Sequence, residues 1–305
     1  MRQVLIVHFS QTGQLDRLAQ SVCGPLQQCR DIQLDFLTLQ PAQPYPFPWP
    51  FLGFFRIFPE TVLMRPQPLL PLAVDANKRY DLVILAYQVW FLSPSQPMTA
   101  FLASPEAAKL LKDTPVVTLI GCRNMWLMAQ EKVKKQLTEL GARLVDNIAL
   151  TDACGTAASF LATPLWLFTG RQKPYSWVPR AGIDEAQISA ASRFGVAMRQ
   201  RLTADSLPIA QPMLRGLGAV RIDEKLIASE RVGNRSFQLW SRLLAALGPQ
   251  QSHRRGAGLV VYIVFLLCLI VTVVPLSALL KKLLAPLLKE RTQREKAYFA
   301  GPSGE

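Results

Sequence analysis

The sequence predicts a doubly wound α/β domain, whose five parallel strands follow the order 2-1-3-4-5, together with a C-terminal hydrophobic membrane helix. Short, continuously apolar runs alternate with amphipathic segments of helical spacing over the first 150 residues. Such runs are typical of strands that helices cover on both faces. Strands that alternate with helices favour right-handed crossovers and therefore a parallel sheet. An uncharged stretch long enough to cross a bilayer stands near the C-terminus.

The elements of this domain follow one another in a regular succession. The helix expected over 14–23 places Leu15 and Leu18 on one face. The helix expected over 126–140 ends before Gly141, which suits a C-cap. The expected strands cover residues 4–9, 32–39, 82–87, 115–121 and 142–150.

Two additions extend this unit to residues 1–200. Residues 40–74 are dense in aromatic residues and too rich in proline for a helix or an inner strand, so we expect a long loop. This insertion either packs over the domain as a lid or contacts lipid or an apolar substrate. Residues 151–200 are a C-terminal extension with an amphipathic helix over 184–202, and 201–256 are expected to be a linker.

Residues 257–281 are expected to form a transmembrane or membrane-anchoring helix. No charge occurs from Leu259 to Leu280, and these 22 residues at about 1.5 Å each cover roughly 33 Å. Basic residues flank the segment, and the tail 282–305 is basic and amphipathic. A single span would export this tail against the positive-inside tendency, whereas a bend at Pro275 would let both parts lie on one anionic surface. Both arrangements stay open.

The composition separates several classes of partner. Lys and Arg number 34 against 21 Asp and Glu, and the net charge of +13 indicates an anionic partner. Basic stretches interleaved with aromatic residues are missing, and much of the charge gathers around the apolar stretch, so we expect an anionic membrane and no nucleic acid. Five scattered cysteines without CxxC spacing predict neither disulfides nor a metal site. The chain starts without a secretory signal, so we expect it on the cytoplasmic face of the cytoplasmic membrane.

The first strand runs directly into the loop Ser10-Gln11-Thr12-Gly13-Gln14. Neither a Walker A loop nor a GxGxxG motif is present. One interpretation is that Ser10 or Thr12 only caps the following helix. The other is a phosphate site, in which two hydroxyls and successive backbone N–H groups bind a phosphate monoester at the positive helix end.

Position in the sheet favours the phosphate site. Ligands of an open α/β sheet bind at the carboxyl ends of the strands, near the reversal of strand order. The loops after the third and fourth strands add aromatic stacking surfaces and polar groups there. Together the three loops meet the requirements of a flavin mononucleotide (FMN). The expected FMN-binding residues are Ser10, Gln11, Thr12, Gly13, Gln14, Gln88, Trp90, Phe91, Gly121 and Arg123.

Catalytic roles fall to polar residues at the strand ends. Arg123 and Asn124 would polarise carbonyl groups of flavin or substrate. Tyr87 and Asp152 are candidates for proton transfer. His8 lies on a buried strand, where a core role is favoured.

The opening pattern of strand, Ser-x-Thr-Gly-x and helix resembles the flavodoxin superfamily. The strings YQVWFLSPSQP, GCRNMWLMAQEKVKKQL, PFPWPFL and FPE are similar to the bacterial family of dialkylresorcinol condensing enzymes. The resemblance covers roughly residues 1–200 and implies a flavodoxin-like fold and a role in making dialkylresorcinols or related aryl lipids. One departure is Leu15, which stands where flavodoxins commonly have a third phosphate-binding hydroxyl.

Condensation chemistry itself does not suit this chain. A ketosynthase needs a nucleophilic cysteine with paired histidines, and the chain has only His8 and His253. The resemblance thus implies another step, in which a flavin oxidises a dialkylcyclohexanedione to the resorcinol. We expect a substrate with an apolar ring or alkyl chains, and biosynthetic proteins as further partners. A flavodoxin-like electron carrier and a flavin-free scaffold for a lipid-biosynthesis complex are the alternatives.

Overall fold

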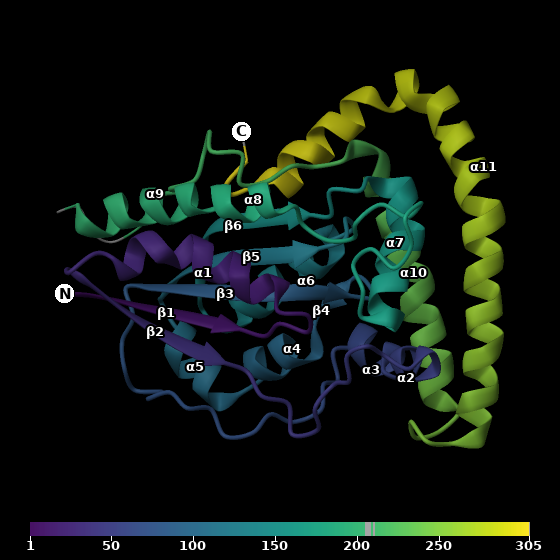
Figure 1. Cartoon of the computed structure of the whole chain (residues 1–305), viewed down its shortest axis with the longest axis horizontal. Helices are drawn as coiled ribbons and strands as arrows, with labels where there is room; N and C mark the ends of the chain where they lie inside the picture. Colours follow the sequence, from purple (N-terminus) through teal and green to yellow (C-terminus); the bar gives the residue numbers. More distant parts are fainter. Residues whose placement is uncertain (205–208, 210, 305) are drawn as a thin grey trace.

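The chain folds into a mostly parallel sheet with helices on both faces (Figure 1). The computed structural model describes residues 1–204, 209 and 211–304. It describes the side chains of all these residues except 156–157 and 273–288. The strands are β1 (Arg2–His8), β2 (Ile32–Thr38), β3 (Leu82–Trp90), β4 (Ser93–Pro94), β5 (Pro115–Cys122) and β6 (Arg143–Thr151). The helices are α1 (Gln14–Gln27), α2 (Phe51–Arg56), α3 (Phe58–Val62), α4 (Gln96–Leu102), α5 (Pro105–Leu111), α6 (Leu127–Glu139), α7 (Thr156–Thr169), α8 (Glu185–Ala190), α9 (Ser192–Thr203), α10 (Glu224–Ala246) and α11 (His253–Ala300).

The five long strands lie in the order β2-β1-β3-β5-β6, and all neighbouring pairs are parallel. Counted among the long strands, this is the predicted order 2-1-3-4-5, which is the flavodoxin-like arrangement. The predicted fold class is confirmed. The short β4 was not predicted; it pairs antiparallel with the end of β3, where Trp90 lies opposite Ser93.

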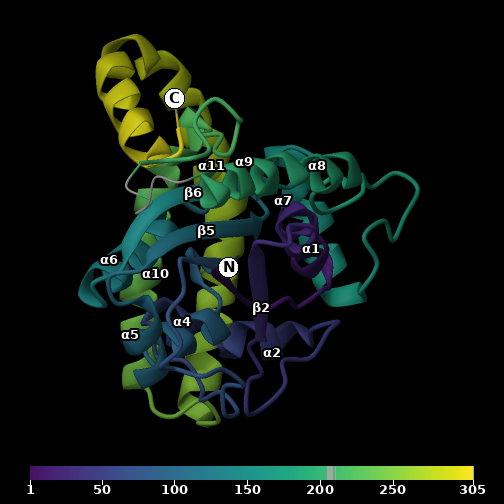
Figure 2. The ribbon, with the colours of Figure 1, turned by 90° about the vertical axis from the view of Figure 1, so that its left-hand side faces the viewer.

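Alternate residues of the central strands belong to two separate cores. Val4 and Ile6 of β1 pack with α1, α8 and α9, whereas Leu5 and Val7 pack with α4, α5 and α6. Figure 2, which looks along the strands, shows these two helical layers on either side of the sheet. Burial on both faces explains why the strands are apolar without alternation.

The insertion 40–74 contains two helices, so the prediction of a loop is wrong for residues 51–62. Pro50 immediately precedes α2, and Pro59 stands in the first turn of α3. A proline in the first turn costs no helical hydrogen bond, because the N–H groups there have no partner within the helix. These prolines therefore start the helices instead of breaking them.

The region after β6 also differs in part from the expectation. The predicted helix 184–202 is present as α8 and α9, which meet at Ala191. Residues 201–256, expected to be a linker, include the 23-residue α10. Its buried face has helical spacing but mixed character, because it consists of Ile227, Glu230, Ser241 and Leu244. The division into the predicted domains otherwise stays a prediction.

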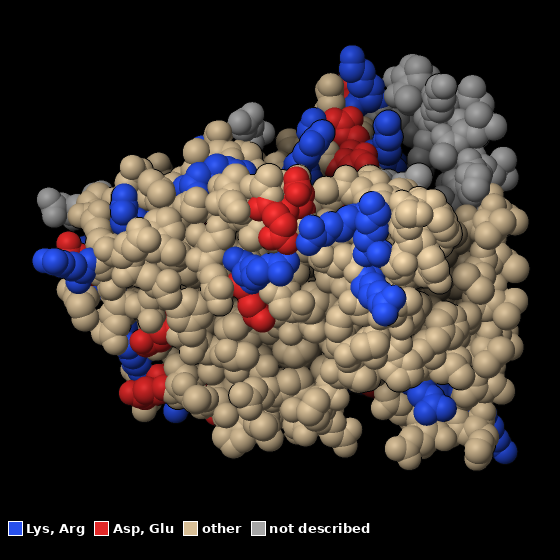
Figure 3. All heavy atoms as spheres, in the orientation of Figure 1, with Lys and Arg blue, Asp and Glu red and all other residues tan. Residues whose placement is uncertain are grey.

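The expected membrane helix 257–281 and most of the tail 282–305 form one continuous helix, α11, of 48 residues. It begins beside α10, and Figure 1 shows it bending back over the sheet, so that the C-terminus lies near β6. Its first part, His253–Thr272, is long and apolar enough to cross a membrane by length and composition. Figure 3 shows few charged side chains on the surface over this part of α11.

Candidate functional site at the carboxyl edge of the sheet

The loop between β1 and α1 carries an unpaired hydroxyl. Gly13 is the N-cap residue of α1 with a left-handed backbone (φ 75°), and no atom lies within 4 Å of the position that a β carbon would take. Gly13 has no side chain to cap the first turn, and Thr12 Oγ1 accepts only a long hydrogen bond, 3.5 Å, from the Gln14 N–H. Ser10 Oγ is buried without a hydrogen-bond partner among the described residues. Buried polar atoms are nearly always paired, so this hydroxyl indicates a ligand position more than a helix cap.

Two glutamines of the loop connect it to its surroundings. The Gln11 backbone N–H donates to Gln88 Oε1 at 3.1 Å, and Gln11 Nε2 donates to the Tyr45 carbonyl oxygen at 3.2 Å. The buried Gln14 amide pairs with the backbone of Ile183 in both directions, at 3.1 and 3.0 Å. The side chain of Gln14 is therefore used within the protein, while Gln11 joins the loop to the insertion.

Leu15 points into the core. It is buried with other α1 residues against the sheet. A β carbon on Gly121 would lie 3.1 Å from Leu15 Cδ1, so the glycine leaves room for the leucine. The departure from the flavodoxin pattern thus has a packing reason at this position.

Trp90 and Phe91 belong to an aromatic cluster that we define as Tyr45, Trp49, Phe54, Trp90 and Phe91. The Trp90 ring is 8% exposed and packs edge-on against Tyr45 and Trp49, with centroids 5.0 and 6.0 Å apart. Phe91, with φ 49°, packs against Phe54 at 4.5 Å. Three members come from the insertion 40–74. The insertion therefore folds back over the end of β3, as its interpretation as a lid expected.

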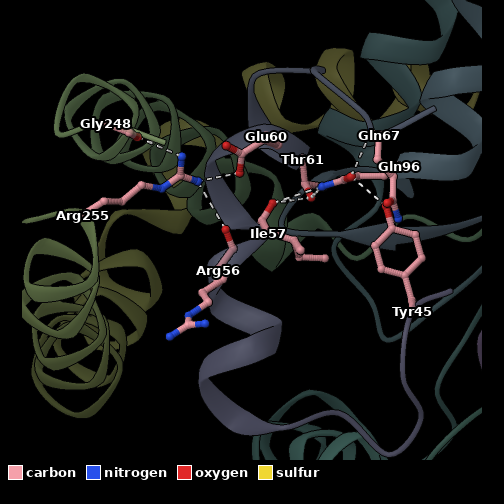
Figure 4. Close-up of polar contacts among 9 residues, drawn as sticks. All are labelled: Tyr45, Arg56, Ile57, Glu60, Thr61, Gln67, Gln96, Gly248 and Arg255. Carbon is pink, nitrogen blue, oxygen red and sulfur yellow. Dashed lines mark hydrogen bonds and ion pairs between the residues drawn. The ribbon is translucent and has the colours of Figure 1, made fainter. Parts of the chain in front are cut away.

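Gln96, at the start of α4, fixes the insertion in place. Its Oε1 accepts a hydrogen bond from the Tyr45 hydroxyl at 2.7 Å (Figure 4). Its Nε2 donates to Thr61 Oγ1 at 2.8 Å and to the Ile57 carbonyl oxygen at 3.3 Å. One buried side chain thus holds two distant parts of the insertion against the sheet domain.

The loop fits a phosphate group. It offers the unpaired Ser10 hydroxyl, the open backbone at Gly13 and the positive end of a 14-residue helix. Aromatic side chains of the kind that flavin rings stack on lie next to it. Those side chains pack against one another here, so a ring bound at the end of β3 would take over contacts that the aromatic cluster makes among its own members.

A cavity of about 620 Å³ opens at the ends of β5 and β6, and Arg123, Asn124 and Asp152 line it. The Arg123 guanidinium lies 4.2 Å from the centroid of the Phe160 ring. Burial lowers the pKa of Arg123, and the charge of Asp152 opposes this effect. Asn124 Nδ2 is buried and has no partner in the part of the chain that the structure describes. Two of the three predicted catalytic residues therefore meet at one cavity.

Asp152 holds the extension after β6 in place. Its Oδ2 accepts hydrogen bonds from the Gly182 N–H at 2.9 Å and the Thr163 hydroxyl at 3.1 Å. Its Oδ1 accepts the Cys154 N–H at 2.9 Å. Both oxygens are thus engaged, which favours a positioning role over the predicted proton transfer.

Glu230 of α10 lines the same cavity and was missed by the sequence analysis. It is 1% exposed; its Oε1 accepts the Met128 N–H at 2.7 Å, at the start of α6, and its Oε2 has no partner among the described residues. Burial raises the pKa of Glu230 from 4.5 to about 8, although the hydrogen bonds from the Met128 and Leu127 backbone lower this pKa. A carboxyl group that titrates near neutral pH beside a cavity is a candidate for proton transfer. The only signal in the sequence was the helical spacing to Ile227.

Tyr87, the third predicted catalytic residue, lies in the core. Its hydroxyl donates to Gln130 Oε1 at 2.5 Å, and burial raises the pKa of Tyr87 well above 10.0. This burial does not favour the predicted role in proton transfer, since a position near a strand end does not fix which way a side chain points. His8 has the predicted core character, with Nδ1 2.8 Å from Asp16 Oδ1 and Nε2 2.9 Å from Thr38 Oγ1.

A second cavity, of about 670 Å³, lies between α3, α6 and α10 and has no predicted site residue in its lining. Lys132 lines it and donates to Ser93 Oγ at 2.6 Å, and burial lowers the pKa of Lys132 from 10.5 to about 8. Over the described residues, no three His, Cys, Asp or Glu side chains gather where they could hold a metal ion.

No protein-family model matches this chain, and no curated protein does. Among solved structures, a flavoprotein from Lactobacillus acidophilus in complex with FMN is 13% identical, over 48% of this chain and 92% of its own, with a TM-score of 0.39. An azoreductase from Bacillus anthracis is 11% identical, over 64% of this chain and 99% of its own, with a TM-score of 0.35. An archaeal flavodoxin is 8% identical, over 67% and 100%, with a TM-score of 0.38. Likenesses this weak carry no argument about activity, and the fold assignment rests on the strand order.

Proposed function

We propose that this protein is an FMN-dependent oxidoreductase that acts on an apolar ring substrate at a membrane surface. The observation that carries the proposal is the loop between β1 and α1, where the unpaired Ser10 hydroxyl and the left-handed Gly13 stand at a helix N-terminus. In sheets of this strand order, ligands bind at the switch point between the first and third strands, as FMN does in flavodoxins. This loop lies at that point, at the end of β1.

The chain would hold the cofactor from two sides. The hydroxyls of Ser10 and Thr12 and the backbone N–H groups of Thr12 and Gly13 would bind the phosphate. Trp90 and Phe91 would contact the ring system, and their packing would exclude water from it. When bound, FMN supplies the acceptor for a hydride.

The finer proposal is the oxidation of a dialkylcyclohexanedione to a dialkylresorcinol, in line with the family resemblance. The ring loses one hydride and one proton, and tautomerisation then makes it aromatic. Arg123 and the unpaired Asn124 Nδ2 would bind the oxygens of the substrate. Glu230, whose carboxyl group titrates near neutral pH, would accept the proton. The apolar side chains of the insertion would contact the alkyl chains.

The membrane part of the proposal rests on α11. Its first part is uncharged from Leu259 onward, and basic residues flank it. Alkylated ring compounds partition into lipid, so an enzyme acting on them gains by lying at the membrane. We place the protein on the cytoplasmic face.

The first test is the flavin content of the purified full-length protein, read from the visible flavin absorption band. We expect a yellow protein that loses its flavin in the double variant Ser10→Ala, Thr12→Val. The matched control removes a serine and a threonine hydroxyl from α9, as Ser192→Ala, Thr203→Val, and should keep the flavin. A colourless protein that takes up no added FMN contradicts the proposal.

The second test separates an enzyme from an electron carrier. An alkylcyclohexane-1,3-dione added to the flavin-loaded protein without oxygen should bleach the flavin and yield one phenol per flavin. Bleaching by a reductase alone, with no phenol from substrates of several chain lengths, supports the carrier.

A flavin-free scaffold is the second candidate, and one observation favours it. Trp90 already packs against Tyr45 and Trp49 over the end of β3. If this packing is permanent, the loop holds no flavin ring. Pull-down of biosynthetic proteins by a colourless chain would then support the scaffold.

A further inference from the structure

The apolar helix α11 is fixed to the domain at its N-terminal end. The buried Arg255 guanidinium pairs with Glu60 Oε2 at 2.6 Å and donates to the Arg56 carbonyl oxygen at 3.3 Å (Figure 4). Two turns further on, the Tyr262 ring stacks on Phe58 with centroids 4.3 Å apart. A partly buried ion pair and a buried stack therefore tie this end of the helix to α2 and α3.

The same helix is fixed to the same domain at its C-terminal end. Phe299 is buried in the core below α6. Beyond the helix, Ser303 Oγ donates to Asp146 Oδ1 at 2.7 Å and accepts the Asn147 N–H at 2.5 Å, both on β6. Glu295 pairs with Arg231 of α10. Both ends of α11 therefore contact one sheet domain.

This geometry decides between the two arrangements that the sequence left open. A transmembrane helix places its ends on opposite sides of a hydrocarbon core about 30 Å thick. The two ends of α11 hold to a single folded unit, and that unit cannot lie on both sides. A span would require the contacts of Arg255 or those of Ser303 to break.

The outward side of α11 is a continuous apolar surface. Only 22% of its apolar window is buried, and the buried residues alternate with exposed ones at helical spacing. Val264 and Leu267, for example, are 55% and 54% exposed. We define the outer face of α11 as Val260, Val261, Val264, Phe265, Leu267 and Val271, all exposed. In Figure 3, the right-hand margin of the molecule, formed by the first part of α11, shows no charged side chains between its lower end and the grey residues.

Exposed basic residues precede the outer face and occur again in the last part of α11. His253 and Arg254 are exposed at the start of the helix. Lys289, Arg291 and Arg294 are exposed near its end, where Arg291 pairs with Glu295 and Arg294 with Glu290. Lysine and arginine beside an apolar helix face favour anionic lipid headgroups, whereas a protein partner for so apolar a face would need no such flanks. The charge pattern therefore points to lipid as the occupant of this face.

We propose that the first part of α11, His253–Thr272, lies in the plane of an anionic bilayer, with its outer face in the lipid and both ends of α11 on the side of the sheet domain. This docking does not depend on any cofactor. One consequence does rest on the proposed function: Tyr262 of α11, Phe58 and Phe91 form a chain of ring contacts, at 4.3 and 5.1 Å, into the aromatic cluster. This packing would hold the candidate site beside the membrane in which an apolar substrate dissolves.

The lipid part is tested by sedimenting the purified full-length chain with vesicles. Vesicles of phosphatidylglycerol and phosphatidylcholine should bind the protein, and binding should weaken with salt and with phosphatidylcholine alone. Val264→Asp and Leu267→Asp should each weaken binding at least about tenfold, since each places a charge where apolar surface would enter the lipid. Phe36→Asp, on β2 at the opposite edge of the sheet, is the matched control and should bind like the unchanged protein.

Two results would overturn the lipid proposal. Binding that is equal for all three variants would show that the outer face does not contact the vesicles. A dimer in solution that Val264→Asp dissociates, without any vesicle binding, would assign the face to a second copy of the chain. Unfolding curves of each variant separate these outcomes from misfolding, because substitutions at exposed sites should shift the curves little.

The in-plane arrangement is tested by labelling cysteines with a membrane-impermeant maleimide in spheroplasts and in inverted vesicles. Gln251→Cys and Gln293→Cys place one exposed thiol on each side of the apolar stretch. Both should react in inverted vesicles and be protected in spheroplasts, relative to the unchanged chain. Reaction of the two thiols in opposite preparations would show a span. Loss of flavin has no effect on the labelling of the two thiols. A failure of the in-plane arrangement can therefore be told apart from a failure of the proposed function.

Discussion

The two ends of the carboxyl edge of the sheet are built in contrasting ways. At β1 and β3, the loop with Ser10 lies beside Trp90, whose ring contacts other aromatic rings and is almost fully covered. At β5 and β6, Arg123 and Glu230 line an open cavity in which buried polar atoms lack partners. One end is thus apolar and closed, and the other is charged and open. The difference teaches that ring binding would use the end of β1 and β3, from which water is excluded. Proton transfer would use the cavity at the end of β5 and β6, which is open to water.

The largest effect is expected at the closed end. Trp90→Ala should lower the free energy of unfolding by about 3–5 kcal/mol, because it empties the centre of the aromatic cluster. Trp177→Ala is the matched control; that ring is 70% exposed, so the change should stay within about 0.5 kcal/mol. Urea unfolding measures both. Equal effects would mean that the cluster contributes little and that the end of β3 is open.

At the open end, Glu230→Gln should change how stability depends on pH. The pKa of Glu230 is raised in the folded chain from 4.5 to about 8, so the unfolded chain releases this proton first as the pH rises. The protonated carboxyl group of Glu230 contributes to the free energy of unfolding in full below pH 4.5. This contribution is lost as the pH rises from there through about 8. The glutamine variant should be more stable than the parent above that range, by about 1–3 kcal/mol.

The control for this experiment is Glu139→Gln, an exposed glutamate of α6. Its unfolding free energy should follow the parent at every pH. A Glu230→Gln profile that runs parallel to the parent would contradict the placement of an uncompensated carboxyl group in the cavity.

The smallest effect on stability, and a specific effect on binding, is expected in the loop. Gly13→Ala places a β carbon at φ 75° and should cost about 1–2 kcal/mol. Gly216→Ala introduces the same strain at φ 75° in open space elsewhere. Both variants should lose similar stability, but only Gly13→Ala should weaken FMN binding in a fluorescence titration. Equal affinities of the two variants for FMN would show that the loop does not belong to the FMN site.

The strands and their order were predictable because Leu82–Tyr87 and its neighbours are apolar on both faces, a pattern that tertiary contacts do not change. The helices of the insertion were not, because Pro50 and Pro59 read as breakers until their places at helix starts are known. In α10, Glu230 and Ser241 interrupt the apolar stripe by which a buried helix is recognised.

The candidate site was predictable only where its residues are close in sequence. The loop from Ser10 to Gly13 forms as expected, since a glycine can adopt the left-handed backbone that starts the following amphipathic helix, and both features are local in the sequence. Glu230 reaches the start of α6 from 102 positions away, at Met128, and no local pattern records that approach. The burial of Tyr87 was not predictable for the same reason, because the helices covering β3 decide which of its side chains are buried.

The central claim, that the loop between β1 and α1 holds the phosphate of FMN, is tested most directly by comparing FMN with riboflavin, which lacks only the phosphate. In equilibrium dialysis against the flavin-free full-length chain, FMN should bind at least about tenfold more tightly, as charge-assisted hydrogen bonds of a few kcal/mol imply. Ser10→Ala should reduce this ratio and leave riboflavin binding unchanged. Equal affinities for the two flavins, or a ratio that Ser10→Ala does not alter, would contradict the account.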